Sequence, residues 1–183
     1  MKWSLLLVGV TSWMLVIANP TVYLIRHGEK PDNDDDHTLS ARGKLRAQCL
    51  RRVFGSNSDY DIQLIIAERR KKNGSQRRPY DTVAPLAKDL GLVIDQTCSK
   101  WHEECVADVV KKYRGPGNIL VCWEHVQLGR IAQELGTETP EHYPKKVFDQ
   151  IWVDPPPYRE ITERVSEACP GLDDDAADDD EAE

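Results

Sequence analysis

The sequence predicts an α/β fold, a three-layer α/β/α sandwich around a mainly parallel central sheet. Three apolar runs of strand length, residues 21–25, 62–67 and 119–123, are separated by segments with helical periodicity. Strands that alternate with helices in this way are typical of parallel sheets with helices on both faces. The chain has 183 residues, which suits one domain.

The first helix is predicted over residues 40–54, because Thr38 or Ser40 can cap its start and Gly55 can end it. Its buried face is predicted to consist of the apolar residues that recur at helical spacing, which are Leu45, Cys49, Leu50, Val53 and Phe54.

The remaining elements follow from the same signals. Pro79 suits the first turn of a helix that ends at Gly91. Further helices are predicted over residues 104–113 and 126–135. Shorter strand-like runs complete the prediction, at residues 93–94, at 147–153 and, as an edge element, at 158–165.

The two ends of the chain differ from its middle. Residues 1–18 begin with a Lys and continue almost wholly apolar, which predicts a secretory signal peptide and a secreted, extracellular protein. An uncleaved anchor or a cytoplasmic chain is the alternative, although the stretch is short for a membrane span. Residues 171–183 contain eight acidic and no basic residues and predict a disordered acidic tail. The folded domain is then residues 19–170, with no stable membrane span after cleavage.

The charge of the domain argues against nucleic acid as a partner. The net charge of −7 comes from the tail, and without its eight acids the chain has 23 acidic against 24 basic residues. No basic stripe of the kind that binds nucleic acid is present. The pattern does not predict an oligomeric state.

The five cysteines are compatible with either compartment. Cys98 and Cys105 lie seven positions apart in a polar connection and could form a disulfide. Cys49 and Cys122 lie in apolar periodic segments and are predicted to be small core residues. Cys169 precedes a Pro-Gly pair near the tail.

Two histidines follow two of the predicted strands. His27 ends the first strand, and His125 follows the strand at residues 119–123. Ligands of parallel sheets bind beyond the carboxyl ends of the strands, so both side chains are expected at one site. A neutral imidazole is a usable nucleophile, and the guanidinium of Arg26 suits phosphate oxygens. Either histidine alone would be more simply explained as a loop residue, and Glu29 is expected to orient neighbouring basic groups.

Four segments resemble the histidine phosphatase superfamily, which is phosphoglycerate mutase-like. Residues 22–29 are similar to its signature, a strand that ends in Arg-His-Gly-Glu. Residues 39–43 resemble its Leu-Ser-x-x-Gly helix opening, and residues 78–87 resemble its Arg-x-x-x-Thr helix. Residues 118–125 resemble the late strand that carries the second catalytic histidine. Together with the Phe-Asp-x-Ile-Trp run at 148–152, these motifs are most similar to a fungal group of phosphoglycerate mutase-like proteins.

The resemblance implies a phosphomonoester hydrolase that acts on a small phosphorylated substrate. His27 would attack phosphorus and become phosphohistidine, while Arg26, Arg78 and His125 would neutralise the phosphoryl oxygens. The motif spacing favours Arg78 over Arg77 for this position. No cofactor is implied, and the histidines and cysteines show no spacing typical of a zinc site, so the reaction is predicted to be independent of metal.

The sequence leaves the general acid open. Glu103 and Glu104 follow the third strand and could reach over the pocket. Glu124 is the alternative, although alternation along a strand could turn it away from the pocket. Many family members have Asp directly after the second histidine, where this chain has Val126. Two other functions remain open, a phosphoglycerate mutase-type phosphotransferase and a catalytically inactive secreted binding protein on the same scaffold.

Overall fold

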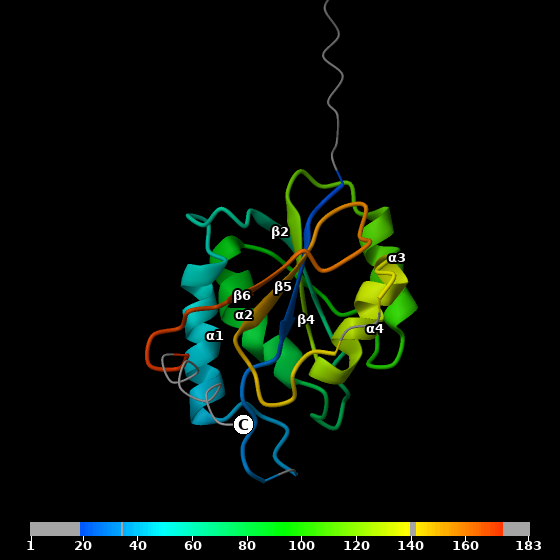
Figure 1. The fold of residues 1–183 in the computed structure, drawn as a ribbon. Helices are drawn as coiled ribbons and strands as arrows, with labels where there is room; N and C mark the ends of the chain where they lie inside the picture. The colour runs from blue at the N-terminus through cyan, green and yellow to red at the C-terminus, as the bar shows by residue number, and fades with distance from the viewer. Residues whose placement is uncertain (1–18, 34, 140–141, 174–183) are drawn as a thin grey trace, which may run out of the picture.

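The computed structural model describes residues 19–33, 35–139 and 142–173. In this part of the chain, six strands form one sheet between two layers of helices (Figure 1). The order across the sheet is β3-β2-β4-β1-β5-β6. The strands are β1 (Val22–Arg26), β2 (Ile62–Ala67), β3 (Ile94–Asp95), β4 (Asn118–Trp123), β5 (Gln150–Asp154) and β6 (Glu163–Ser166).

The sheet is mainly parallel. β4 pairs in parallel with both β1 and β2, and β2 pairs in parallel with β3. β5 is antiparallel to β1, and the edge strand β6 is antiparallel to β5. The predicted α/β architecture is therefore confirmed. Because β1 and β4 are parallel neighbours, with Arg26 opposite Trp123, the residues that follow them emerge side by side.

Two helices cover each face of the sheet (Figure 1). α1 (Ala41–Val53) and α2 (Arg78–Leu90) pack on one face, while α3 (Glu103–Lys112) and α4 (His125–Leu135) pack on the other. Successive strand residues alternate between these faces. Leu24 and Val121 accordingly belong to the core under α3 and α4, whereas Ile25 and Leu120 belong to the core under α1 and α2.

The first helix begins as the sequence predicts, but it buries a different face. Ser40 caps it, because its side chain accepts a hydrogen bond from the Gly43 amide at 3.0 Å. Phe54 is fully buried, but Leu45 is 61% exposed, so its predicted place on the buried face is wrong. At 100° per residue, Leu45 lies half a turn away from Phe54. Arg46 points inward instead and is 2% exposed.

Two disulfides join parts of the domain. Cys98 and Cys105 are bonded, as the sequence suggests. Cys49 is bonded to Cys169, so the prediction that Cys49 is only a small core residue is wrong. These two cysteines are 120 positions apart, and periodicity within one helix reports burial but not a distant partner. Cys122 is buried and free.

The ends of the domain are only partly described. The predicted signal peptide lies outside the described residues, as does the tail beyond residue 173. The first residues of the predicted tail pack on the domain, since Leu172 is buried against Cys49 and Cys169, and Asp173 binds Arg46. Among the described residues, none of the helices has the length and apolar character needed to cross a membrane.

Candidate active site

His27 lies directly beyond β1, at the carboxyl end of the sheet. Its backbone amide donates to the carbonyl of Trp123 at 3.0 Å, and its ring is 4% exposed. Nδ1 lies 2.7 Å from the carbonyl oxygen of Gly28. A carbonyl only accepts, so Nδ1 carries the ring proton and Nε2 carries the free lone pair. The ring is thereby fixed in the tautomer that a nucleophilic Nε2 requires.

Glycine at position 28 allows this strand end to pack against α1. A Cβ atom on Gly28 would lie 2.9 Å from the carbonyl oxygen of Gly43, closer than side chains are found. The amide of Gly28 donates to Oγ1 of Thr82 at 2.9 Å, which ties the loop to α2 as well. Both helices of one layer therefore hold the backbone that carries His27.

The surroundings of His27 keep its ring neutral. Burial lowers the pKa of His27 to about 4, and the charges of Arg26 and Arg78 act in the same direction. The hydrogen bond to Gly28 and the charge of Glu124 oppose this shift. Above this pKa the ring is unprotonated and available as a nucleophile.

Arg26 is held by the loop that precedes β5. Its Nη1 donates to the carbonyls of Lys145 at 2.5 Å and Val147 at 2.9 Å, and its guanidinium lies 3.7 Å from the ring centre of Phe148. Burial lowers the pKa of Arg26 to about 10, so the group is still a cation at neutral pH. Nε is buried and has no hydrogen-bond partner among the described residues.

Arg78 and Arg77 lie at the start of α2 but face different surroundings. Arg78 donates from Nη2 to the carbonyl of Asp36 at 2.6 Å and from Nε to that of Thr38 at 3.1 Å. It lines a cavity of about 330 Å³ at the carboxyl end of the sheet. Arg77 instead pairs with Asp81 at 2.5 Å and does not line that cavity.

Glu124 and His125 lie at the junction of β4 and α4. β4 ends at Trp123, so the alternation of side chains along a strand does not apply to Glu124. Glu124 lines the same cavity as Arg78 and pairs with Lys100. His125 is the first residue of α4. Burial, followed by the charge of Arg26, lowers the pKa of His125. Both residues therefore lie close enough to the site to interact with its charged groups: Glu124 acts on the pKa of His27, and Arg26 acts on the pKa of His125.

Glu68, which no motif in the sequence singles out, is a further acid at this end of the sheet. It follows β2 directly, is 0% exposed, and neither of its carboxyl oxygens has a partner among the described residues. Burial, followed by the negative charge of Glu124, raises the pKa of Glu68 to about 8, while Lys100 and Lys71 act to lower it. The signal was present in the sequence, because Glu68 ends an apolar strand just as His27 does.

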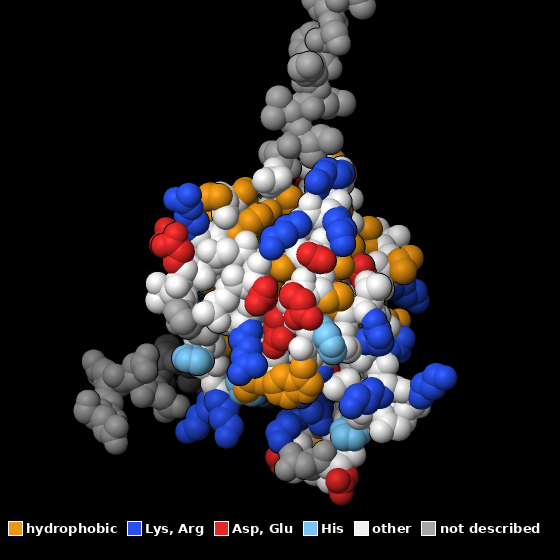
Figure 2. All heavy atoms as spheres, turned by 90° about the vertical axis from the view of Figure 1, so that its right-hand side faces the viewer, with side chains coloured by type: hydrophobic (Ala, Val, Ile, Leu, Met, Phe, Trp, Pro, Cys, Tyr) orange, Lys and Arg blue, Asp and Glu red, His pale blue; other side chains and the backbone are white. Residues whose placement is uncertain are grey.

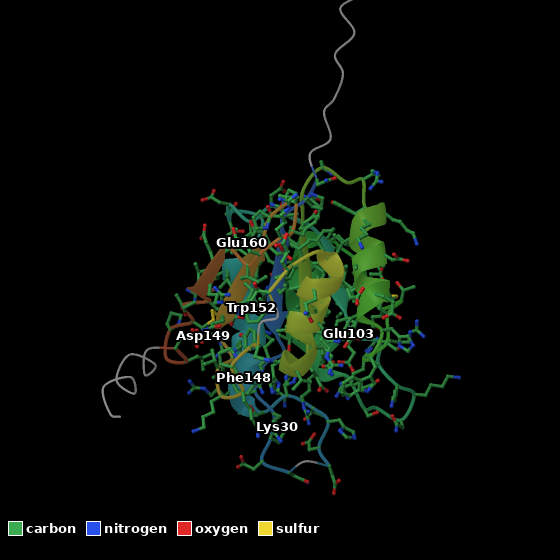
Figure 3. The ribbon with its side chains drawn as sticks, turned by 45° about the vertical axis from the view of Figure 1, so that its right-hand side comes forward. Lys30, Glu103, Phe148, Asp149, Trp152 and Glu160 are labelled. Carbon is green, nitrogen blue, oxygen red and sulfur yellow. A yellow bond between two sulfur atoms is a disulfide. The ribbon has the colours of Figure 1, made fainter. Side chains whose placement is uncertain are left out.

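Glu103 and Glu104 are not brought to His27. Both lie in the first turn of α3, where Glu103 is buried and Glu104 is exposed. Neither lines the cavity at Arg78 or acts on the pKa of His27. Figure 3 shows Glu103 and Phe148, which covers Arg26, on opposite sides of the end of α4. The Cys98–Cys105 disulfide holds this turn of α3 beside the end of β3.

Glu29 anchors the loop that carries the nucleophile, as expected. Arg46 donates from Nη2 to Glu29 at 2.8 Å and to Asp173 at 2.8 Å, and from Nη1 to Glu167 at 2.7 Å. Glu167, Asp173 and Cys169 are also the set of potential metal ligands found in the described part of the chain. The sulfur of Cys169 is in a disulfide and both carboxylates bind Arg46, so these groups already have partners.

The surface around the site is rich in cations. Figure 2 views the α3 and α4 side, and Lys, Arg and His side chains gather in its lower half, the end at which β1 and β4 finish. A larger cavity of about 680 Å³ lies between α1 and α2, but it contains none of the predicted site residues except Arg77. The chemistry-bearing groups are therefore at the end of the sheet and not in this larger cavity.

The fold is similar to that of histidine phosphatases of known structure. It is similar to the structure of the protein histidine phosphatase SixA complexed with tungstate, with a TM-score of 0.59 and 14% identity over 80% of this chain and 97% of that one. It is also similar to SixA from Agrobacterium tumefaciens, with a TM-score of 0.56 and 14% identity over 81% of this chain and 98% of that one. No protein-family model matches the chain. No curated protein matches it either.

Proposed function

We propose that this protein is a phosphomonoester hydrolase that uses Nε2 of His27 as its nucleophile. The observation that carries the proposal is the hydrogen bond from Nδ1 of His27 to the Gly28 carbonyl, which leaves the Nε2 lone pair free on a buried, neutral ring. Arg26 and Arg78 supply positive charge beside it. The SixA histidine phosphatase, which shares this fold, is complexed with tungstate, a tetrahedral oxyanion like phosphate.

The first step transfers the phosphoryl group to the enzyme. The Nε2 lone pair of His27 attacks phosphorus, and the bond between phosphorus and the ester oxygen breaks with its electron pair on that oxygen. Arg26, Arg78 and His125 neutralise the charge on the phosphoryl oxygens during this transfer. Loss of one such donor is expected to slow the reaction by about a hundredfold or more.

The leaving oxygen needs a proton, and we assign its supply to Glu124 together with Glu68. Glu124 lines the cavity, whereas Glu68 lies buried behind the end of β2. Burial and the negative charge of Glu124 both favour the protonated form of the Glu68 carboxyl. Glu68 holds this proton, since its pKa is raised to about 8, and Glu124 passes it to the leaving oxygen.

The second step releases phosphate. Water attacks the phosphorus of phosphohistidine, the bond between phosphorus and Nε2 breaks, and the electron pair returns to His27. The proton lost by water goes to the acid pair, which restores the starting state. Cationic side chains match the charge in both steps, so the proposed reaction needs no metal ion.

Hydrolysis of p-nitrophenyl phosphate tests the proposal. The wild type is expected to release phosphate in the presence of chelator, and His27→Ala is expected to lose at least about a thousandfold in kcat/KM. The rate should rise as pH increases through about 4, where His27 loses its proton. Equal activity in both proteins would exclude His27 as the nucleophile. A folded, inactive wild type would favour a phosphotransferase or a binding protein.

The two disulfides support a second part of the proposal, that the protein is secreted. Disulfides persist in oxidising compartments and are rare in the cytosol. Residues 1–18 would then be a cleaved signal peptide. The mass of the unreduced protein from culture medium tests this, because retention of those residues would contradict cleavage.

A further inference from the structure

A second cavity adjoins the one at Arg78. It has a volume of about 380 Å³, and its lining is almost entirely basic or polar: Arg69, Arg70, Lys71, Lys72, Gly74, Arg77 and Gln96. Lys71 lines both cavities, and the chain at residues 74–78 contributes to each. A ligand with its phosphate at Arg78 can therefore extend directly into this basic cavity.

The loop that carries these cations has a defined conformation. The amide of Lys71 donates to the Ser75 carbonyl at 3.0 Å, and the amide of Gly74 donates to the Lys71 carbonyl at 3.0 Å. Oδ1 of Asn73 accepts a further bond from the Ser75 amide at 3.1 Å. Gly74 has a φ of 86°, which favours glycine in this tight turn.

Two of the arginines are also fixed by side-chain contacts. Arg69 donates from Nε to the backbone carbonyl of Gln96 at 3.1 Å, and Arg70 donates from Nε to the side-chain oxygen of Gln96 at 3.2 Å. The guanidinium of Arg70 also lies 3.5 Å from the ring centre of Tyr80. Both groups are thus positioned, and their remaining N–H groups are available to a ligand.

The charge of this loop is not balanced by the protein. Within the described part of the chain, none of the four consecutive basic residues 69–72 forms a salt bridge, whereas Arg46, Arg77 and Lys100 each do. Four like charges around one hollow repel one another, and an anion in that hollow relieves the repulsion. The one acid that lines the neighbouring cavity, Glu124, pairs with Lys100, so a second anionic group would be attracted toward residues 69–72.

We infer that the cavity beside residues 69–72 is a second anion site of the proposed phosphatase and that its substrates are small bisphosphates. One phosphate lies at His27 and Arg78, and the other binds Arg70 and Lys72. This inference rests on the proposed function for the first phosphate. Guanidinium groups bind phosphate oxygens through paired hydrogen bonds, and lysine adds a point charge.

Alkanediol phosphates test the inference, because each diol can carry one phosphate or two. The wild type is expected to prefer the bisphosphate by about tenfold in kcat/KM, the effect of one charge-assisted hydrogen bond, with an optimum at one chain length. Arg70→Gln combined with Lys72→Gln should reduce this preference to about twofold or less and leave p-nitrophenyl phosphate hydrolysis within about twofold of the wild type. Asn73-Gly74-Ser75 is an acceptor sequence for N-glycosylation, so N-linked glycans are removed before measurement.

The matched control is Lys111→Gln combined with Arg159→Gln, which removes the same charge away from both cavities and should keep the preference. The inference would be overturned if the wild type hydrolysed the monophosphate and the bisphosphate with equal kcat/KM. It would also be overturned if the preference for the bisphosphate were unchanged in the Arg70→Gln, Lys72→Gln double variant. The affinities of alkane bisphosphonates and monophosphonates, measured by calorimetry, distinguish failure of the second anion site from failure of the proposed phosphatase activity. Tighter bisphosphonate binding that depends on Arg70 and Lys72 would support the second site even if no substrate is cleaved, and equal binding would remove it.

Discussion

Two buried charge sites near the carboxyl end of the sheet differ in how their charges are satisfied. Around Arg46, three acids accept its hydrogen bonds, and the side chain is 2% exposed. Burial acts to lower the pKa of Arg46, but the bonds to its acids outweigh burial and raise it. Glu68 is equally buried, yet no described residue donates to either of its oxygens, and its pKa is raised to about 8.

The difference separates a structural role from a chemical one. The Arg46 cluster links α1, the loop after His27 and the C-terminal segment through ion pairs, so its charged groups act in holding these parts together. Glu68 has no bond to lose and keeps its proton at neutral pH, which is the state that a proton donor requires. Removal of Arg46 should therefore affect stability, and removal of the Glu68 carboxyl should affect catalysis.

The largest expected effect is that of Arg46→Met on stability. The substitution leaves Glu167 and Asp173 buried without their cation, and leaves Glu29 only the exposed Arg42, which costs about 3–5 kcal/mol. Urea unfolding at neutral pH measures the loss. Arg42→Met is the control, because Arg42 also binds Glu29 but its side chain is 47% exposed, and its loss should stay below about 1 kcal/mol. Equal losses in the two variants would contradict a structural role specific to the buried cluster.

The next effect is that of Glu68→Gln on catalysis. An alkyl phosphate has a poor leaving group and should lose about a hundredfold in kcat/KM, whereas p-nitrophenyl phosphate, which needs little protonation, should change little. In the wild type, the alkyl phosphate rate should fall as pH increases through about 8, where Glu68 loses its proton, and Glu68→Gln should abolish this fall. Rates of both substrates across this pH range measure the effect.

Glu103→Gln is the matched control for this prediction. Glu103 is also a buried acid with an unpartnered oxygen, but it does not line the cavity at Arg78. Its substitution should leave both substrates and the pH profile unchanged. If Glu103→Gln slowed the alkyl phosphate and Glu68→Gln did not, proton donation would belong to the start of α3.

The fold could be predicted from the sequence because its signals are local. Periodicity and capping residues located the strands β1, β2 and β4 and all four helices to within a few positions. The same rules failed for Leu45, where the inward position belongs to the charged side chain of Arg46. Hydrophobic patterns do not predict that a buried position holds an arginine whose partners are far away in the chain.

The candidate site could be predicted in part. His27 and His125 are predicted because the ends of parallel strands collect ligand groups, and the same rule points to Glu68. The sequence favours Glu103 or Glu104 as the general acid because it does not show where the first turn of α3 lies. The Cys49–Cys169 disulfide also depends on tertiary contacts between distant segments. The similarity to the fungal group stays a prediction.

The smallest expected effect concerns Asp154, a buried acid at the opposite end of the sheet. It pairs across from Val22 at the start of β1, is 0% exposed, and has no partner among the described residues. Burial raises the pKa of Asp154 to about 7. Its carboxyl group resembles that of Glu68 in being buried and without partners, but it lies at the end of the sheet opposite to the candidate active site. Asp154 therefore tests whether a buried, unpaired acid affects catalysis only when it lies at the candidate active site.

Asp154→Asn is expected to change the pH dependence of stability and not activity. Between an unfolded pKa of about 4 and the folded value of about 7, only the folded state keeps the proton, so the unfolding free energy falls as pH rises. This contribution is about 1.4 kcal/mol per pH unit, and it should be absent from the variant. Urea unfolding of the wild type and the variant at about pH 5 and pH 6 isolates the contribution of Asp154. Glu68 and the other acids contribute equally to the pH dependence of both proteins. An unchanged slope would mean that Asp154 is ionised in the fold, and a loss of alkyl phosphate hydrolysis would mean that an unpaired buried acid acts on the site from either end of the sheet.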